Sequence, residues 1–168
     1  MYTLKHIINN GEHTWTGDMG LICPNCLEAT IYEGSVSIHR KPVHVQVLCP
    51  KCGHKFSTHA FNIIDPNIVN TIAILNRKGY KTKACCEGHV SFYYGEKVSN
   101  DAYVYLDNVE DVNIIEDHPL PQPWYIDKED LAKDIFVIRC NEENKVHLLE
   151  SWAKSLNNKD KAEFEYFY

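Results

Sequence analysis

Two Cys-Pro-x-Cys segments, Cys23–Cys26 and Cys49–Cys52, dominate the first third of this 168-residue chain. In each segment the two cysteines are three positions apart, so a tight turn can direct both sulfurs at one metal ion while backbone N–H groups of the turn hydrogen-bond to them. Four thiolates grouped in this way are the ligand set of a structural zinc site, and a shell of four protein ligands leaves no position for water. We therefore expect one structural, non-catalytic Zn²⁺ bound by Cys23, Cys26, Cys49 and Cys52. The alternative is four unrelated buried thiols.

The rest of the composition narrows the class of protein. The chain has seven cysteines, an odd number, and no N-terminal stretch of the secretory type, so we expect a cytoplasmic protein with reduced thiols. No apolar run approaches the roughly 18 residues that cross a bilayer, which predicts no membrane partner. The net charge of −6 disfavours broad binding to duplex nucleic acid, because that affinity comes from many lysines and arginines.

The pattern of the chain changes near Asp65-Pro66. We expect a zinc-ribbon module with an N-terminal hairpin over residues 1–62 and an α+β ligand-binding domain over 63–168. Residues 14–20 are rich in turn formers, and Gly53 follows the second cysteine pair where positive φ is often needed. Apolar alternation predicts ribbon strands at 29–32, 43–48 and 55–61.

Beyond the boundary, a helix is marked at both ends. Asp65 is a good N-cap, Pro66 suits the first helical position, and Gly79 suits the position after the last turn, which predicts a helix over 66–78. A second helix, capped by Asn141, carries an apolar face of Leu149, Trp152, Ala153 and Leu156. Short strands are expected between the helices, at 80–84, 90–94, 102–106 and 134–140. The predicted fold class is α+β, with an N-terminal four-cysteine zinc ribbon and a mainly antiparallel sheet with two main helices.

A second informative segment follows the first helix. Four cations lie within residues 77–83 of an otherwise acidic chain, and they lead into a turn that combines two thiols, a carboxylate, a glycine and an imidazole. Glycine lets such a turn direct successive N–H groups at an anion. We expect a small anionic ligand, such as a nucleotide derivative, to bind through Arg77, Lys81, Thr82, Lys83, Cys86, Glu87, Gly88 and His89. Its base would stack on an aromatic ring such as Tyr93, Tyr103, Tyr105, Trp124 or Tyr125.

Other interpretations of the segment remain open. The turn from Cys85 to His89 could be purely structural. In a catalytic alternative, His89 activates the thiol of Cys86 or Cys85, or these three residues hold a second metal with Glu87 as general base. The chain offers no further acid, base and orienting group, so we expect binding without chemistry.

The sequence is also compatible with a third function, nucleic-acid binding. The basic loop at 39–42, the expected ribbon tip, instead suggests a nucleic-acid-binding adaptor. The sequence leaves open whether the chain forms a homo-oligomer.

The segment GYKTKACCEGH, residues 79–89, resembles a "GYxTxxCCxGH" segment of small, uncharacterised bacterial and bacteriophage proteins that carry a zinc knuckle before it. That resemblance spans about residues 62–125 and implies a ligand pocket at the turn, with a phage counter-defence protein that sequesters a nucleotide as one role. The motif alone is also loosely similar to the Thr-x-Ser-Ser-Cys-x-Gly-Arg turn of the tRNA-wybutosine methyltransferase family. Here Ala84 and Cys85 stand in place of small hydroxyl residues and His89 in place of the arginine, so this second resemblance does not imply methyl transfer.

Overall fold

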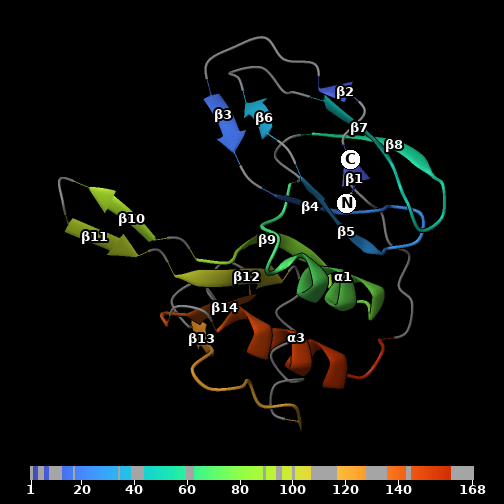
Figure 1. The fold of residues 1–168 in the computed structure, drawn as a ribbon. Coiled ribbons are helices and arrows are strands. Elements are labelled where there is room, and N and C mark those ends of the chain that lie inside the picture. Colours follow the sequence, from blue (N-terminus) through green and yellow to red (C-terminus); the bar gives the residue numbers. More distant parts are fainter. Residues whose placement is uncertain are drawn as a thin grey trace. The chain divides into compact units, whose positions relative to one another are not determined.

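The computed structural model describes residues 2–3, 6–7, 13–16, 18–33, 35–38, 44–59, 63–88, 90–93, 96–99, 101–106, 117–127, 136–142 and 145–159. The chain divides into two compact units, with residues 1–69 in the first and 70–162 in the second. Short, mainly antiparallel sheets and helices make up the chain (Figure 1). The predicted α+β class, with a four-cysteine cluster in the N-terminal region, is confirmed.

Three small sheets form the described part of the first unit. One has the order β1-β5-β4, the second β2-β7-β8, and the third pairs β3 with β6. The pairing of β1 with β5 is parallel and the others are antiparallel. The strand bounds are β1 Tyr2–Thr3, β2 His6–Ile7, β3 His13–Thr16, β4 Met19–Ile22, β5 Ala29–Glu33, β6 Ser35–Ile38, β7 His44–Leu48 and β8 Lys55–His59.

The ribbon strands predicted around the cysteine pairs correspond to β5, β7 and β8, but the turn-rich interpretation of residues 14–20 is wrong. This segment contributes to the strands β3 and β4. In β4 the alternating Met19 and Leu21 are buried, and Gly20 between them is a strand residue. Glycine at this position allows the backbone to pack closely. Composition alone suggested a turn, because glycine is also common in turns.

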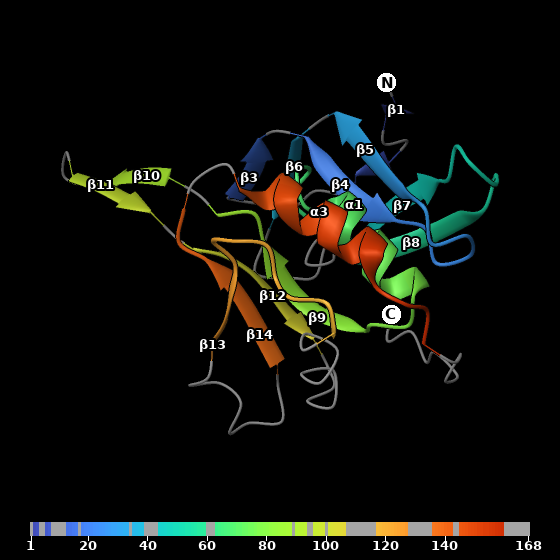
Figure 2. The ribbon, with the colours of Figure 1, turned by 90° about the horizontal axis from the view of Figure 1, so that it is seen from below.

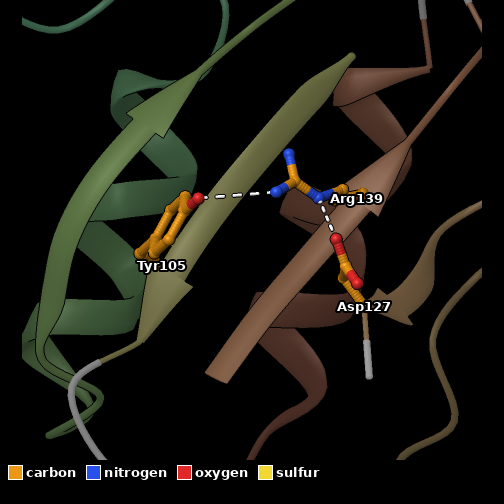
Figure 3. Close-up of polar contacts among 3 residues, drawn as sticks. All are labelled: Tyr105, Asp127 and Arg139. Atoms are coloured by element: carbon orange, nitrogen blue, oxygen red, sulfur yellow. Dashed lines mark hydrogen bonds and ion pairs between the residues drawn. The ribbon is translucent and has the colours of Figure 1, made fainter. Parts of the chain in front are cut away.

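A four-stranded antiparallel sheet, in the order β13-β14-β12-β9, is the centre of the second unit. The helices α1 and α3 lie next to each other (Figure 2) and behind this sheet (Figure 3). Val104, Leu106 and Ile138 of the sheet are fully buried, as are Leu75 of α1 and Leu149 of α3. The bounds are α1 Val69–Arg77, β9 Thr82–Cys86, β10 Val90–Tyr93, β11 Glu96–Ser99, β12 Ala102–Leu106, β13 Tyr125–Asp127, β14 Phe136–Cys140 and α3 Val146–Ser155, with β10 paired to β11.

Helix α1 begins later than predicted and ends as predicted. The carbonyl of Asp65 accepts the N–H groups of Ile68 and Val69, so residues 66–68 form a turn before the α-helix proper. At the other end Gly79 has φ of 93°, its N–H donates to the Asn76 carbonyl, and the N–H of Tyr80 donates to that of Leu75. This pair of bonds is the Schellman arrangement, which satisfies carbonyls that the helix leaves free.

Helix α3 has the predicted apolar face but a different start. Its face of Leu149, Trp152, Ala153 and Leu156 is buried, as expected. The prediction that Asn141 caps it is wrong, because Lys145 occupies the N-cap position without a side-chain cap. Instead, Lys145 contributes its carbonyl, which accepts the indole N–H of the buried Trp124 at 3.0 Å. This tertiary bond anchors the start of α3 to Trp124, but it does not cap the helix, because a cap accepts from the free N–H groups of the first turn.

Candidate functional site

The two cysteine segments form loops with the same backbone hydrogen bonds. In the first, the N–H of Leu27 donates to the Cys23 carbonyl at 2.8 Å; in the second, the N–H of Gly53 donates to the Cys49 carbonyl at 2.9 Å. Leu27 has φ of 56° and Gly53 has φ of 72°. The positive φ predicted for Gly53 is confirmed, whereas that of Leu27 gave no signal in the sequence because leucine rarely adopts it.

Each loop is also closed at its base. The N–H of Cys23 donates to the Glu28 carbonyl and that of Cys49 to the His54 carbonyl, at 3.1 and 2.9 Å. Both ends of each loop are thus fixed by backbone bonds. We call these two loops, residues 23–28 and 49–54, the knuckles.

The four knuckle sulfurs come together. The Sγ atoms of Cys23, Cys26, Cys49 and Cys52 all lie within 4.8 Å of one another. Between the knuckles, Cys23 Sγ is 3.7 Å from Cys52 Sγ, and Cys26 Sγ is 3.7 Å from Cys49 Sγ. Sulfurs about 2.3 Å from a tetrahedral zinc would be about 3.8 Å apart. The cluster can therefore hold a metal ion, and its dimensions fit zinc.

Exposure differs strongly among the four thiols, and the pKa values of Cys23, Cys26 and Cys52 are shifted in different directions. Cys23 and Cys49 are buried, Cys26 is half-buried and Cys52 is exposed. Burial raises the pKa of Cys23 to about 12 and also raises the pKa of Cys26. The Asn25 amide, whose Nδ2 donates to Cys52 Sγ at 3.6 Å, lowers the pKa of Cys52 to about 6. A metal must therefore displace protons from the buried side of the cluster, while the exposed side already favours thiolate.

An open hollow of about 430 Å³ adjoins the knuckles. The rings of His54 and Phe56 are stacked in it, with centroids 6.2 Å apart and planes at 10°. His54 thus packs on an aromatic ring beside the cluster, and the sequence gave no sign of this hollow. Its lining residues are Pro24, Asn25, His54, Lys55, Phe56 and Ser57.

The cation-rich segment lies at the end of α1 and the start of β9. Arg77 and Lys83 are exposed, and Lys81 is half-buried. Both the backbone N–H and the hydroxyl of Thr82 bond to Asn76 Oδ1, at 3.1 and 3.3 Å. Thr82 therefore fixes the start of β9 against the last turn of α1.

The fourth cation, Lys78, connects the end of α1 to the end of α3. Its Nζ donates to the carbonyls of Lys154 and Leu156 at the end of α3. Burial lowers the pKa of Lys78. This ammonium therefore neutralises the negative end of the α3 dipole.

The turn after β9 is described up to Gly88, which has φ of 83°. The N–H of Gly88 donates to Cys86 Sγ at 3.4 Å. Cys86 lies opposite Tyr103 in the sheet, whereas Cys85 lies opposite the buried Val104. The two cysteines thus belong to opposite faces of the sheet, as strand alternation requires. His89 lies outside the described residues.

The strand register puts Tyr103, Tyr105 and Arg139 on the face of the sheet that carries Cys86. Figure 3 shows Tyr105 and Arg139 of this face together with Asp127. The Arg139 guanidinium lies 5.7 Å from the Tyr103 ring and 6.0 Å from the Tyr105 ring, and the two rings meet edge to face. Arg139 Nε donates to Asp127 Oδ2 at 2.5 Å and its Nη2 donates to the Tyr105 hydroxyl at 3.4 Å. The hydrogen bond to Asp127 raises the pKa of Arg139. We call Tyr103, Tyr105, Asp127 and Arg139 the tyrosine–arginine cluster.

The sequence predicted only the two tyrosines of this cluster. It also suggested Trp124, which lies elsewhere. No local sequence pattern marks Arg139 and Asp127, because only strand pairing brings β13, β14 and β12 together. Tyr125, on the same face, is 41% exposed, but Trp124 is a core residue with 1% exposure. The side chains of Tyr93 and His59, the loop at 39–42 and residues 163–168 lie outside the description.

Comparisons of the chain with family models, curated proteins and solved structures give no match. Among the described residues, no helix has both the length and the apolar character needed to cross a bilayer.

Proposed function

We propose that the protein binds one zinc ion through Cys23, Cys26, Cys49 and Cys52, and that this zinc stabilises the N-terminal unit. The observation that carries the proposal is the pair of matched knuckles, which bring four sulfurs within 4.8 Å of one another. Thiolate-only sets are typical of structural zinc, and four ligands close its shell. The small sheets around the cluster bury little apolar surface, so metal binding supplies folding free energy on the order of 10 kcal/mol. The need for reduced thiols supports a cytoplasmic location.

Metal analysis of the purified protein tests this proposal. We expect one zinc per chain in the unmodified protein and in a Cys85→Ser control, because Cys85 lies in β9 outside the cluster. Cys49→Ser should lose the zinc, and the backbone amides of β4, β5, β7 and β8 should then lose protection from hydrogen exchange. Equal zinc content in Cys49→Ser and Cys85→Ser, or a metal-free protein with fully protected strands, would contradict the proposal.

A second function is proposed for the C-terminal unit: binding of a small anionic, nucleotide-like ligand, without chemistry, at the segment from Arg77 to His89. Its support is the position of the cations beside an aromatic face. Lys83, at a register irregularity of β9, is exposed and lies next to Ala84, whose small side chain is opposite Tyr105. Phosphate would bind the cations, and a base would stack on the half-exposed rings of the tyrosine–arginine cluster.

Three matched probes test this second function by calorimetry: AMP, ribose 5-phosphate and adenosine. AMP should bind more tightly than either of the others, and Lys83→Glu should weaken its binding at least tenfold, which is about 1.4 kcal/mol. Lys51→Glu, a charge reversal at an exposed lysine of the second knuckle, is the control and should have no effect. Failure of all three probes to bind would reject a nucleotide site of this kind, and an affinity for single-stranded oligonucleotides that falls steeply with salt would favour the nucleic-acid adaptor.

A further inference from the structure

The four sulfurs of the cluster are not equally accessible. Cys23 and Cys49 are 2% and 1% exposed, Cys26 is half-buried, and Cys52 is exposed to solvent. Cys52 lies on the outer side of the second knuckle, next to the exposed residues Lys51 and Gly53. A small reagent in solution therefore reaches Cys52 more readily than the half-buried Cys26, and far more readily than the buried Cys23 and Cys49.

Two pairs of sulfurs lie especially close together across the knuckles. Cys52 Sγ lies 3.7 Å from Cys23 Sγ, and Cys26 Sγ lies 3.7 Å from Cys49 Sγ. A disulfide bond requires the sulfurs to approach to about 2 Å. Both pairs are within a short movement of that distance, but only the first pair contains an exposed sulfur.

We propose that Cys52 and Cys23 form a hydroperoxide-sensitive pair, whose oxidation to a disulfide removes two of the four metal ligands and releases the metal. This inference depends on the proposed zinc site and adds its regulation. It assigns Cys52 as the sulfur that is oxidised first and Cys23 as the resolving thiol.

The chemistry balances with hydrogen peroxide as the oxidant. The Cys52 thiolate attacks one peroxide oxygen, the O–O bond breaks, and hydroxide leaves, which converts Cys52 to a sulfenic acid. The Cys23 thiolate then attacks the Cys52 sulfur, the S–O bond breaks and a second hydroxide leaves. Two thiolates lose two electrons in total, and one peroxide is reduced to two hydroxides, which the buffer protonates to water.

Metal coordination is what keeps these thiols in the reactive form. A cysteine that binds a metal does so as a thiolate, and only protons at low pH compete with the metal for it. The Asn25 amide, which donates to Cys52 Sγ, further stabilises negative charge on this sulfur. In the closed disulfide the two knuckles would be cross-linked and would retain only Cys26 and Cys49 as metal ligands, too few for a structural site.

The experiment treats the zinc-loaded, full-length protein with one equivalent of hydrogen peroxide in the presence of a chromogenic zinc chelator. Free thiols are then alkylated and disulfides are assigned by peptide mass spectrometry. We expect zinc release to accompany a disulfide that joins Cys23 to Cys52, and dithiothreitol followed by zinc should restore the metal content. Zinc release with a disulfide between Cys26 and Cys49, or oxidation of Cys85 or Cys86 while zinc is retained, would overturn the inference.

Two histidine variants separate the exposed sulfur from the others. Histidine is a zinc ligand that peroxide does not convert to a disulfide partner. Cys52→His should hold zinc against peroxide, with a release rate at least tenfold below that of the unmodified protein. Cys26→His, the matched control, should remain sensitive. Equal release rates from the two variants would contradict the assignment, and if either variant fails to bind zinc the disulfide map of the unmodified protein still decides the question.

Zinc content measured before oxidation distinguishes this inference from the function on which it depends. A protein isolated without zinc, and unable to take it up, would reject the metal site itself. A protein with one zinc that one equivalent of peroxide does not release would reject only the redox pair.

Discussion

Gly20 and Ile64 exchange two backbone hydrogen bonds. The N–H of Gly20 donates to the Ile64 carbonyl at 2.8 Å, and the N–H of Ile64 donates to the Gly20 carbonyl at 2.9 Å. A Cβ atom at position 20 would lie 2.6 Å from the Ile64 carbonyl oxygen and 2.7 Å from Val69 Cβ. Glycine at position 20 is therefore required by the close approach of strand β4 to the segment that leads into α1.

Gly20→Ala should destabilise the N-terminal unit by about 1–3 kcal/mol, because the added methyl group overpacks a site whose nearest neighbours include backbone. The zinc-loaded protein should show faster hydrogen exchange at the amides of residues 20 and 64. Zinc content should stay at one per chain, since the knuckles do not change. Unchanged exchange at both amides would mean that the close approach does not constrain this position.

Gly53→Ala tests a different property of glycine. Nothing lies within 4 Å of a Cβ built at Gly53, so the cost comes only from its φ of 72° and should be about 1 kcal/mol. Urea unfolding of the zinc-loaded protein, followed by zinc release, measures it. A cost as large as that of Gly20→Ala would show that the knuckle is more constrained than its backbone angle requires.

Asn76→Ala removes the oxygen that accepts two hydrogen bonds from Thr82. We expect a cost of about 1–2 kcal/mol in the C-terminal unit, because the Thr82 backbone N–H loses its partner. Thr82→Val removes only the hydroxyl bond and should cost less, at most about 1 kcal/mol. The unfolding transition monitored by the fluorescence of the buried Trp124 and Trp152 gives both values, and a larger effect of Thr82→Val than of Asn76→Ala would contradict the expectation.

Lys78→Met removes the ammonium that donates to the Lys154 and Leu156 carbonyls at the end of α3. We expect a loss of about 1.5–3 kcal/mol, the range for hydrogen bonds to charged groups. Lys154→Met is the matched control. Its side chain is 62% exposed and pairs with Glu150 one turn earlier, so its loss should cost about 0.5 kcal/mol or less. The measurement is the midpoint of the unfolding transition followed by tryptophan fluorescence. Equal shifts for Lys78→Met and Lys154→Met would mean that Lys78 behaves as an ordinary surface residue.

Local chemistry predicted a large part of this structure. The knuckles could be anticipated because two cysteines three positions apart need only a turn, and the end of α1 because Gly79 suits the left-handed position. The ribbon strands and the apolar face of α3 followed from the spacing of apolar residues. In each of these cases the information lies within a few residues of the feature.

The features that were missed depend on distant partners. The strand role of Gly20 depends on Ile64, and the start of α3 is anchored by the distant Trp124 indole, which donates to the Lys145 carbonyl. Arg139 meets Asp127 only because β13 pairs with β14 in one register. Contacts of this kind arise from tertiary packing and have no local pattern in the sequence.

The shared backbone pattern of the knuckles has a kinetic consequence. Each loop is closed by its own hydrogen bonds, and each carries two sulfurs before the other loop is in place. Metal loading can therefore pass through a half-formed state, in which one knuckle binds the ion as a bidentate ligand. The second knuckle then binds the same ion in an intramolecular step. The rate of the second step would depend on the length of the connection at residues 29–48, and lengthening it should slow closure while barely changing the first capture.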